Sequence, residues 1–157
     1  MSPTPSSPAE RRNETRRMVQ NLLDERQAML VSYCHLIGEE PSRDQARLRR
    51  RLEEFCQLLV DYLALGHFEI YTRLDEGTER RERVLRIARE IYPRIASLTQ
   101  EAIAFNDDFD PARNPLDLSD FPRRLSELGK GLAERLELED RLIGALLAPR
   151  EAERDLP

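Results

Sequence analysis

The sequence of 157 residues contains few of the features on which several classes of protein depend. Its two cysteines, Cys34 and Cys56, form no CxxC pair, and a disulfide-stabilised fold would use more of them. We therefore expect reduced thiols in a cytoplasmic protein. Six glycines and the absence of β-rich runs argue against a sheet protein. No stretch approaches the ~20 consecutive apolar residues of a membrane span, and the polar N-terminus does not resemble a signal peptide.

The sequence also lacks the motifs of catalysis and cofactor binding. Its only two histidines, His35 and His67, complete no ExxH pair, whereas carboxylate-bridged di-iron bundles need two such pairs. It has no glycine-rich phosphate loop and no GxSxG nucleophile motif. We expect no catalytic residues, no cofactor and no metal. The net charge of −5 argues against direct nucleic-acid binding, and the arginine runs at 47–51 and 80–83 lie among glutamates, as is typical of a solvated helix surface.

What the sequence does contain is helical periodicity. Apolar residues recur at three- and four-residue steps in four stretches. These stretches predict helices at about residues 15–37, 42–74, 79–106 and 119–146. Ser42 and Ser119 are the expected N-caps of the second and fourth helices. Pro93 removes a backbone donor, so we expect it to kink the third helix or to divide it in two. Gly66, in the second helix, lies on the core-facing stripe and is expected to let a neighbouring helix approach.

Four long amphipathic helices with mostly short links predict an all-α, single-domain, up-down-up-down four-helix bundle. We expect the bundle at residues 13–148. The Pro- and Ser-rich residues 1–12 are expected to form a disordered tail, and residues 149–157 a second tail.

Three polar residues fall where the helical stripes predict core. Glu139 projects among the apolar residues of the last helix, while His67 and Tyr62 lie at the two edges of the stripe on the second. A buried carboxylate must be paired or hydrogen-bonded. We therefore expect an internal polar network that joins Glu139 with His67 or Tyr62 and fixes helix register. The alternative is a small-ligand or metal pocket inside the bundle.

The second helix is also apolar on the side opposite its core stripe. Five residues project about 180° from that stripe, namely Glu54, Asp61, Leu65, Phe68 and Thr72. Single exposed apolar residues are common, but an exposed aromatic beside an aliphatic residue is typical of a protein-binding hot spot. The acidic rim favours a basic partner helix. A generic helical adaptor for some other partner remains a further alternative.

The same helix carries a family resemblance. Residues 55–57, 59–63, 66–68 and 70–71 resemble the central signature of the Rsd/AlgQ family, the bacterial regulators of sigma D. Residues 138–143 are similar to the LED(K/R)LI segment of that family's last helix. The similarity covers about residues 15–148.

The resemblance implies an all-α bundle that binds the primary sigma factor of RNA polymerase. It implies that the C-terminal promoter-recognising domain of sigma is the target, and that bound sigma is sequestered from core polymerase. It also implies that Asp61 and Phe68 contact sigma. The chain departs from the family in having Leu22 where members carry a tryptophan in the first helix. The free protein is expected to be a monomer or a weak homodimer.

Overall fold

The computed structural model describes residues 7–39, 44–71 and 81–148. These residues form α-helices and one π-helical turn, and no strand occurs among them. The elements are α1 (Pro8–Ile37), α2 (Gln45–Gly66), the π-helical turn η1 (His67–Tyr71), α4 (Glu82–Phe109) and α5 (Phe121–Leu147). Within the described ranges, none of the helices combines the length and the apolar character that a membrane span requires.

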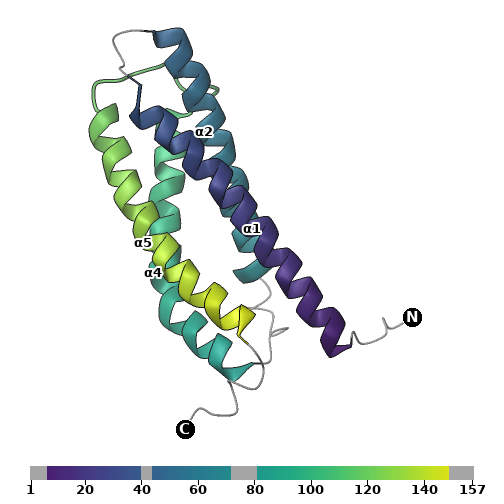
Figure 1. Cartoon of the computed structure of the whole chain (residues 1–157). Helices are drawn as coiled ribbons and strands as arrows, with labels where there is room; N and C mark the ends of the chain where they lie inside the picture. The colour runs from purple at the N-terminus through teal and green to yellow at the C-terminus, as the bar shows by residue number, and fades with distance from the viewer. Residues whose placement is uncertain (1–6, 40–43, 72–80, 149–157) are drawn as a thin grey trace.

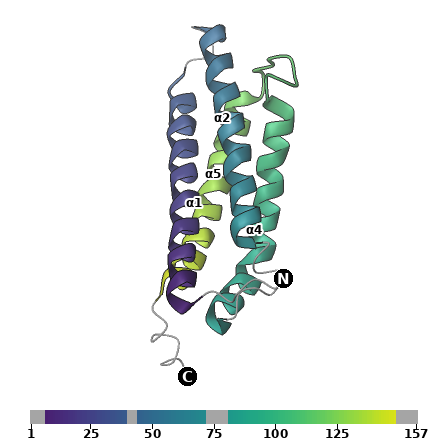
Figure 2. The same cartoon turned by 90° about the vertical axis from the view of Figure 1, so that its right-hand side faces the viewer.

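The four α-helices run alternately up and down the long axis of the molecule (Figure 1). α1 packs mainly on α2, and α4 packs mainly on α5, so the bundle consists of two helical hairpins. Figure 2 shows α1, α2 and α4 side by side, with α5 closing the bundle behind them. The predicted all-α, up-down-up-down topology is confirmed.

The core is formed by the stripes that the periodicity predicts. On α2 and η1 the predicted stripe is buried throughout the described part, at Leu48, Leu52, Phe55, Leu59, Leu63, Gly66 and Ile70. Residue 74, the last position of that stripe, lies outside the described residues. Fully burying one such Leu, Ile or Phe side chain contributes roughly 1.5–3 kcal/mol, so this one stripe supplies a large share of the driving force for folding.

α1 begins seven residues earlier than expected, and the prediction of a disordered tail over residues 1–12 is wrong for residues 8–12. The Ser7 side chain accepts a hydrogen bond from the backbone of Glu10, and the Glu10 side chain accepts one from the backbone of Ser7. This capping box, with Pro8 at the first helical position, starts the helix. Because residues 8–14 are all exposed, they show no apolar periodicity to predict from. Residues 1–6 and 149–157 lie outside the described residues.

Three other helix ends differ from prediction. Asp44 caps α2 through its side chain, which accepts from the backbone of Arg47, while residue 42 lies outside the described residues. α4 runs to Phe109, three residues beyond its predicted end, because Phe109 stacks on Phe105 and reaches Phe121. The N-cap of α5 is Asp120 and not Ser119. The backbone and hydroxyl of Ser119 both donate to Asp117 instead.

Pro93 lies inside α4, which continues through it as one helix and is not divided in two. Its ring is on the exposed side of the helix. The carbonyl of Arg89, which loses its backbone donor to the proline, therefore faces solvent that can hydrogen-bond it.

At Gly129 of α5 the missing side chain leaves space for a side chain of α1. A Cβ atom there would lie 2.0 Å from the Tyr33 hydroxyl oxygen of α1, a distance that no real side chain allows. That hydroxyl donates to the carbonyl of Leu125 at 2.8 Å, so it bonds α5 directly where the glycine leaves space. At Gly66 a Cβ would meet its neighbours at 3.6 Å or more, which is ordinary contact. Gly129, and not Gly66, is thus the position where the approach depends on glycine.

We predict that Gly129→Ala destabilises the protein by about 1–3 kcal/mol, because the added methyl group displaces Tyr33 and its hydrogen bond. Gly144→Ala is the matched control, since a Cβ at that α5 position meets nothing within 4 Å. There the alanine should stabilise the helix by up to about 1 kcal/mol. Urea unfolding followed by circular dichroism measures both changes. Equal stabilities for the two variants would contradict the close approach.

Candidate functional site

Charge divides α2 into two parts. Its first two turns are strongly basic, with Arg47, Arg49, Arg50 and Arg51. From residue 52 to residue 71 the chain has neither lysine nor arginine, and its charged residues are Glu53, Glu54, Asp61 and Glu69. The two ends of one helix therefore present potentials of opposite sign.

Apolar side chains protrude from the acidic part. Phe68 is 71% exposed and Val60 40% exposed, while Leu65 is half-buried. Glu54 and Asp61 are exposed beside them, and Asp61 accepts a hydrogen bond from Gln57 at 2.9 Å. We call the set of Glu54, Val60, Asp61, Leu65 and Phe68 the α2 outer face.

Sequence reasoning placed four of these residues on this face and missed one. Val60 escaped because it lies between the predicted core stripe and the predicted outer stripe. Its spacing of eight residues from Phe68, two helical turns, was the available signal. Thr72, the fifth predicted residue, lies outside the described residues.

The π-helical turn η1 determines which of its side chains point outward. His67, Phe68 and Glu69 are exposed, whereas Ile70 and Tyr71 are buried. A π-turn closes its hydrogen bonds over five residues, so each residue turns the chain through a smaller angle than in an α-helix. The core-facing side is thereby shifted along the sequence by about one residue. Tyr71 enters the core and His67 leaves it.

The prediction that His67 belongs to the internal network is therefore wrong. Its ring is exposed and packs edge-on against Phe68, with ring centroids 5.1 Å apart. His67 consequently borders the α2 outer face.

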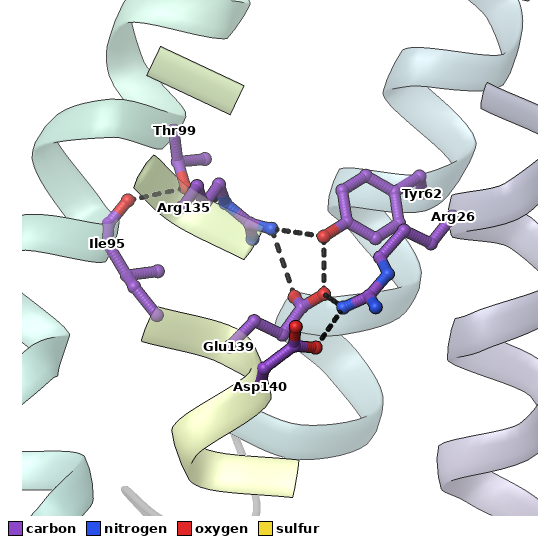
Figure 3. Close-up of polar contacts among 7 residues, drawn as sticks. All are labelled: Arg26, Tyr62, Ile95, Thr99, Arg135, Glu139 and Asp140. Atoms are coloured by element: carbon purple, nitrogen blue, oxygen red, sulfur yellow. Dashed lines mark hydrogen bonds and ion pairs between the residues drawn. The ribbon is translucent and has the colours of Figure 1, made fainter. Parts of the chain in front are cut away.

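A buried cluster of polar groups lies at the centre of the bundle (Figure 3). Glu139 is 0% exposed and Arg135 is 2% exposed, both on α5. The Tyr62 hydroxyl donates to Glu139 Oε1 at 2.5 Å, and Arg135 Nη1 donates to Glu139 Oε2 at 3.0 Å. Arg135 Nη1 also donates to the Tyr62 oxygen at 2.7 Å. The three side chains thus form a closed triangle, in which Tyr62 and Glu139 are joined as the stripes predicted.

The other two helices complete this cluster. Arg26 of α1 reaches Glu139 at 3.4 Å and Asp140 at 2.6 Å. Thr99 of α4 accepts a hydrogen bond from Arg135 Nε at 3.1 Å and donates to the carbonyl of Ile95. We call Arg26, Tyr62, Thr99, Arg135 and Glu139 the four-helix polar cluster, because each helix supplies at least one group. The cluster holds two arginines and one carboxylate, and the charges balance when Asp140, the exposed partner of Arg26, is counted with it.

The burial of several of these groups shifts their pKa values. Burial raises the pKa of the Tyr62 and Tyr71 hydroxyls well above the ordinary value, and the negative charge of Glu139 adds to the rise. Both tyrosines are therefore protonated donors at neutral pH. Burial alone would lower the pKa of Arg135, but Tyr62 and Glu139 outweigh it, so the net change is upward and the guanidinium stays charged. The Tyr71 hydroxyl is buried without a hydrogen-bond partner among the described residues.

Sequence reasoning missed Arg135, Arg26 and Thr99. Arg135 lies one turn before Glu139, at the i, i+4 spacing of a helical ion pair, and that spacing was the available signal. Protein groups contact both oxygens of Glu139, so the carboxylate is satisfied without a ligand. Among the residues that the structure describes, no group of three or more His, Cys, Asp or Glu side chains could hold a metal ion. The described interior thus gives the ligand-pocket alternative no support.

Comparison with known proteins identifies the family. Residues 3–147 match the family model described as "Regulator of RNA polymerase sigma(70) subunit, Rsd/AlgQ". Proteins named "Regulator of sigma D" from Salmonella typhimurium, Salmonella typhi and Salmonella enteritidis PT4 are each 36% identical over 137 residues. In each case the aligned region covers 85% of this chain and 84% of the relative. The chain belongs to the Rsd/AlgQ family.

The structure places Leu22, the position at which the sequence departs from the family resemblance, in the core of this Rsd/AlgQ protein. Leu22, where the resemblance implies a tryptophan, is 0% exposed. Its Cδ1 atom lies 3.7 Å from the position that a Cβ on Gly66 would take. The residue therefore packs in the core between α1 and the end of α2.

We predict that Arg135→Met destabilises the protein by about 3–5 kcal/mol, because it leaves Glu139 buried without its closest cation. The matched control is Arg94→Met, which removes an exposed α4–α5 ion pair with Glu134 and should leave the stability nearly unchanged, because solvent screens that pair. The double variant Arg135→Met/Glu139→Leu should recover part of the loss, since no buried charge is then left unpaired. Urea unfolding at pH 7 measures all three. A loss for Arg135→Met no larger than for Arg94→Met would contradict the role of the cluster.

Proposed function

We propose that the α2 outer face binds the C-terminal promoter-recognising domain of the primary sigma factor and sequesters sigma from core RNA polymerase. The observation that carries the proposal is Phe68, a large aromatic side chain that is 71% exposed within an acidic, otherwise charge-free surface. Binding is the whole activity in this proposal, and no catalytic step is involved.

Phe68 has the properties of an interface anchor. A phenylalanine side chain has no polar group to desolvate when a partner covers it, and its burial contributes roughly 1.5–3 kcal/mol. Val60 and Leu65 extend the apolar area along the helix, and Glu54 and Asp61 form a polar rim. An aromatic centre within a polar rim is the usual composition of an interface hot spot.

Charge selects the kind of partner. Because residues 52–71 carry acidic groups and no lysine or arginine, the face attracts a basic surface and repels an acidic one. Promoter-recognising domains bind DNA phosphates and are therefore basic themselves. In the proposed complex, the basic surface with which the sigma domain binds DNA is covered by the acidic α2 outer face.

The comparisons support the choice of sigma over another basic protein. The family description names the sigma-70 subunit of RNA polymerase, and the Salmonella relatives carry the name of a sigma regulator. If the promoter-recognising domain is covered, sigma neither reads the upstream promoter element nor completes its docking on core polymerase. Alternative sigma factors then gain access to core.

We predict that Phe68→Ala weakens binding to the isolated C-terminal domain of primary sigma by about tenfold or more, the loss typical of a hot-spot residue. Asp61→Ala should chiefly slow association, and its effect should shrink as salt rises from about 50 to 500 mM. Biolayer interferometry at several salt concentrations separates the two effects. Ile103→Ala is the matched control, since Ile103 is an exposed apolar residue of α4 (38%) that lies outside the face.

Unchanged sigma affinity in the double variant Asp61→Ala/Phe68→Ala would refute the proposed face. Sequestration itself is tested separately, by adding core polymerase to the preformed complex with sigma. The proposal expects competition, in which increasing amounts of this protein reduce the holoenzyme formed. A stable ternary complex with core polymerase would contradict sequestration.

A further inference from the structure

A groove of about 640 Å³ lies between the last turns of α1 and the first turns of α2. It is far along α2 from Phe68 and is lined mainly by polar and basic side chains. The lining residues are Ser32, His35, Arg47, Arg50, Arg51 and Glu54. The four lining residues of α2 are separated by three, one and three positions, so they share one side of the helix.

One carboxylate positions two of the arginines. Glu39, whose side chain is 14% exposed, pairs through Oε1 with Nε of Arg47 at 3.0 Å and with Nε of Arg51 at 2.9 Å. A guanidinium that is held at Nε keeps its two terminal NH₂ groups, which are the fork that binds a second anion. The side chain of Arg51 is itself only 27% exposed. The pairing therefore restrains the basic wall of the groove.

Two further groups of the groove have no partner. Arg50 forms no ion pair within the described part of the chain. Ser32 is 5% exposed, and its hydroxyl has no hydrogen-bond partner among the described residues. Among the described residues the fully buried side-chain atoms without a partner are on Tyr71 and Asn106, so the Ser32 hydroxyl is open to the groove that it lines and can donate to a ligand there.

The local charge fits a small anion. Three guanidiniums face the two carboxylates of Glu39 and Glu54, in a chain whose net charge is −5. Arginine forks and hydroxyl donors match the oxygens of phosphate. The volume lies in the range of ligand sites, about 300–1,000 Å³. Beyond the groove, α2 is acidic and repels an extended polyanion that lies along the helix. Nucleic acids and anionic membrane surfaces are therefore disfavoured as ligands of the groove.

We propose that the α1–α2 groove binds a small phosphate-bearing anion, with Arg50 and Ser32 as direct donors and Arg47 and Arg51 as the restrained basic wall. This site is separate from the α2 outer face and does not rest on sigma binding. Glu54 alone belongs to both.

The test is isothermal titration calorimetry of the full chain with inorganic pyrophosphate at low salt, in the absence of sigma. We expect saturable binding that Arg50→Ala weakens about tenfold or more. Arg50→Lys should lose part of the affinity, since it keeps the charge but not the fork. Arg86→Ala, at an exposed arginine of α4 outside the groove, is the charge-matched control and should bind normally. Urea unfolding of each variant confirms that the fold is retained.

Three outcomes would overturn the proposal. The first is the absence of saturable pyrophosphate binding to the unaltered protein. The second is an equal loss in Arg50→Ala and Arg86→Ala, which would indicate non-specific attraction. The third is Arg50-dependent binding of a poly-glutamate peptide, duplex DNA or anionic phosphatidylserine vesicles without pyrophosphate binding, which would assign the groove to a macromolecule or a membrane. Because the assay contains no sigma, its result is independent of the proposed sigma complex.

Discussion

The burial of Glu139 is the constraint on which the rest of the bundle depends. A carboxylate with no solvent exposure costs several kcal/mol unless cations and donors surround it. Here the compensating groups come from every helix: Arg26 from α1, Tyr62 from α2, and Arg135 itself tied to Thr99 of α4. The placement of the four helices in the structure brings these groups within hydrogen-bond distance. Leucine-rich stripes alone would permit neighbouring registers with similar apolar burial, whereas a slipped register would leave this charge unpaired.

Fixing the register also fixes the surface. Tyr62 points inward to Glu139, and this sets the rotation of α2 about its axis. The opposite side, with Asp61 and Leu65, is then turned to solvent. The charged and hydroxyl groups of the four-helix polar cluster are bonded to one another, and the proposed recognition surfaces lie outside the core. The same cluster that orders the core thus determines which residues α2 offers to a partner.

Much of this architecture could be predicted from residue spacing. The fold class, the core stripe of α2 and the pairing of Tyr62 with Glu139 follow because a polar residue inside an apolar stripe must find a partner. Residue spacing does not single out Arg135 as the buried partner of Glu139, since the chain is rich in arginines and nearly all of them lie at solvated positions. The early start of α1 depends on a local capping box and on no core contact, so periodicity gives no sign of it.

The error at His67 has a different origin. A constant turn per residue is the premise of every stripe argument, and η1 breaks it. The five-residue turn exchanges His67 for Tyr71 in the core and leaves Phe68 outside. The exchange has a cost, because the Tyr71 hydroxyl is buried with no partner among the described residues, at about 1–3 kcal/mol. π-turns occur often at functional sites, and here the turn carries the most exposed aromatic side chain of the described chain.

The division of charge along α2 separates the two proposed sites, which attract partners of opposite charge. With a rise of about 1.5 Å per residue, Arg50 and Leu65 are separated by roughly 22 Å along the axis. The Debye length at physiological salt is about 8 Å, so the basic groove and the acidic outer face hardly influence each other through solvent. Glu54 is the exception, since it follows Arg50 by one helical turn, about 6 Å along the axis, and belongs to both sets of residues. Any electrostatic influence of an anion in the groove on a partner at the outer face therefore acts chiefly through this carboxylate.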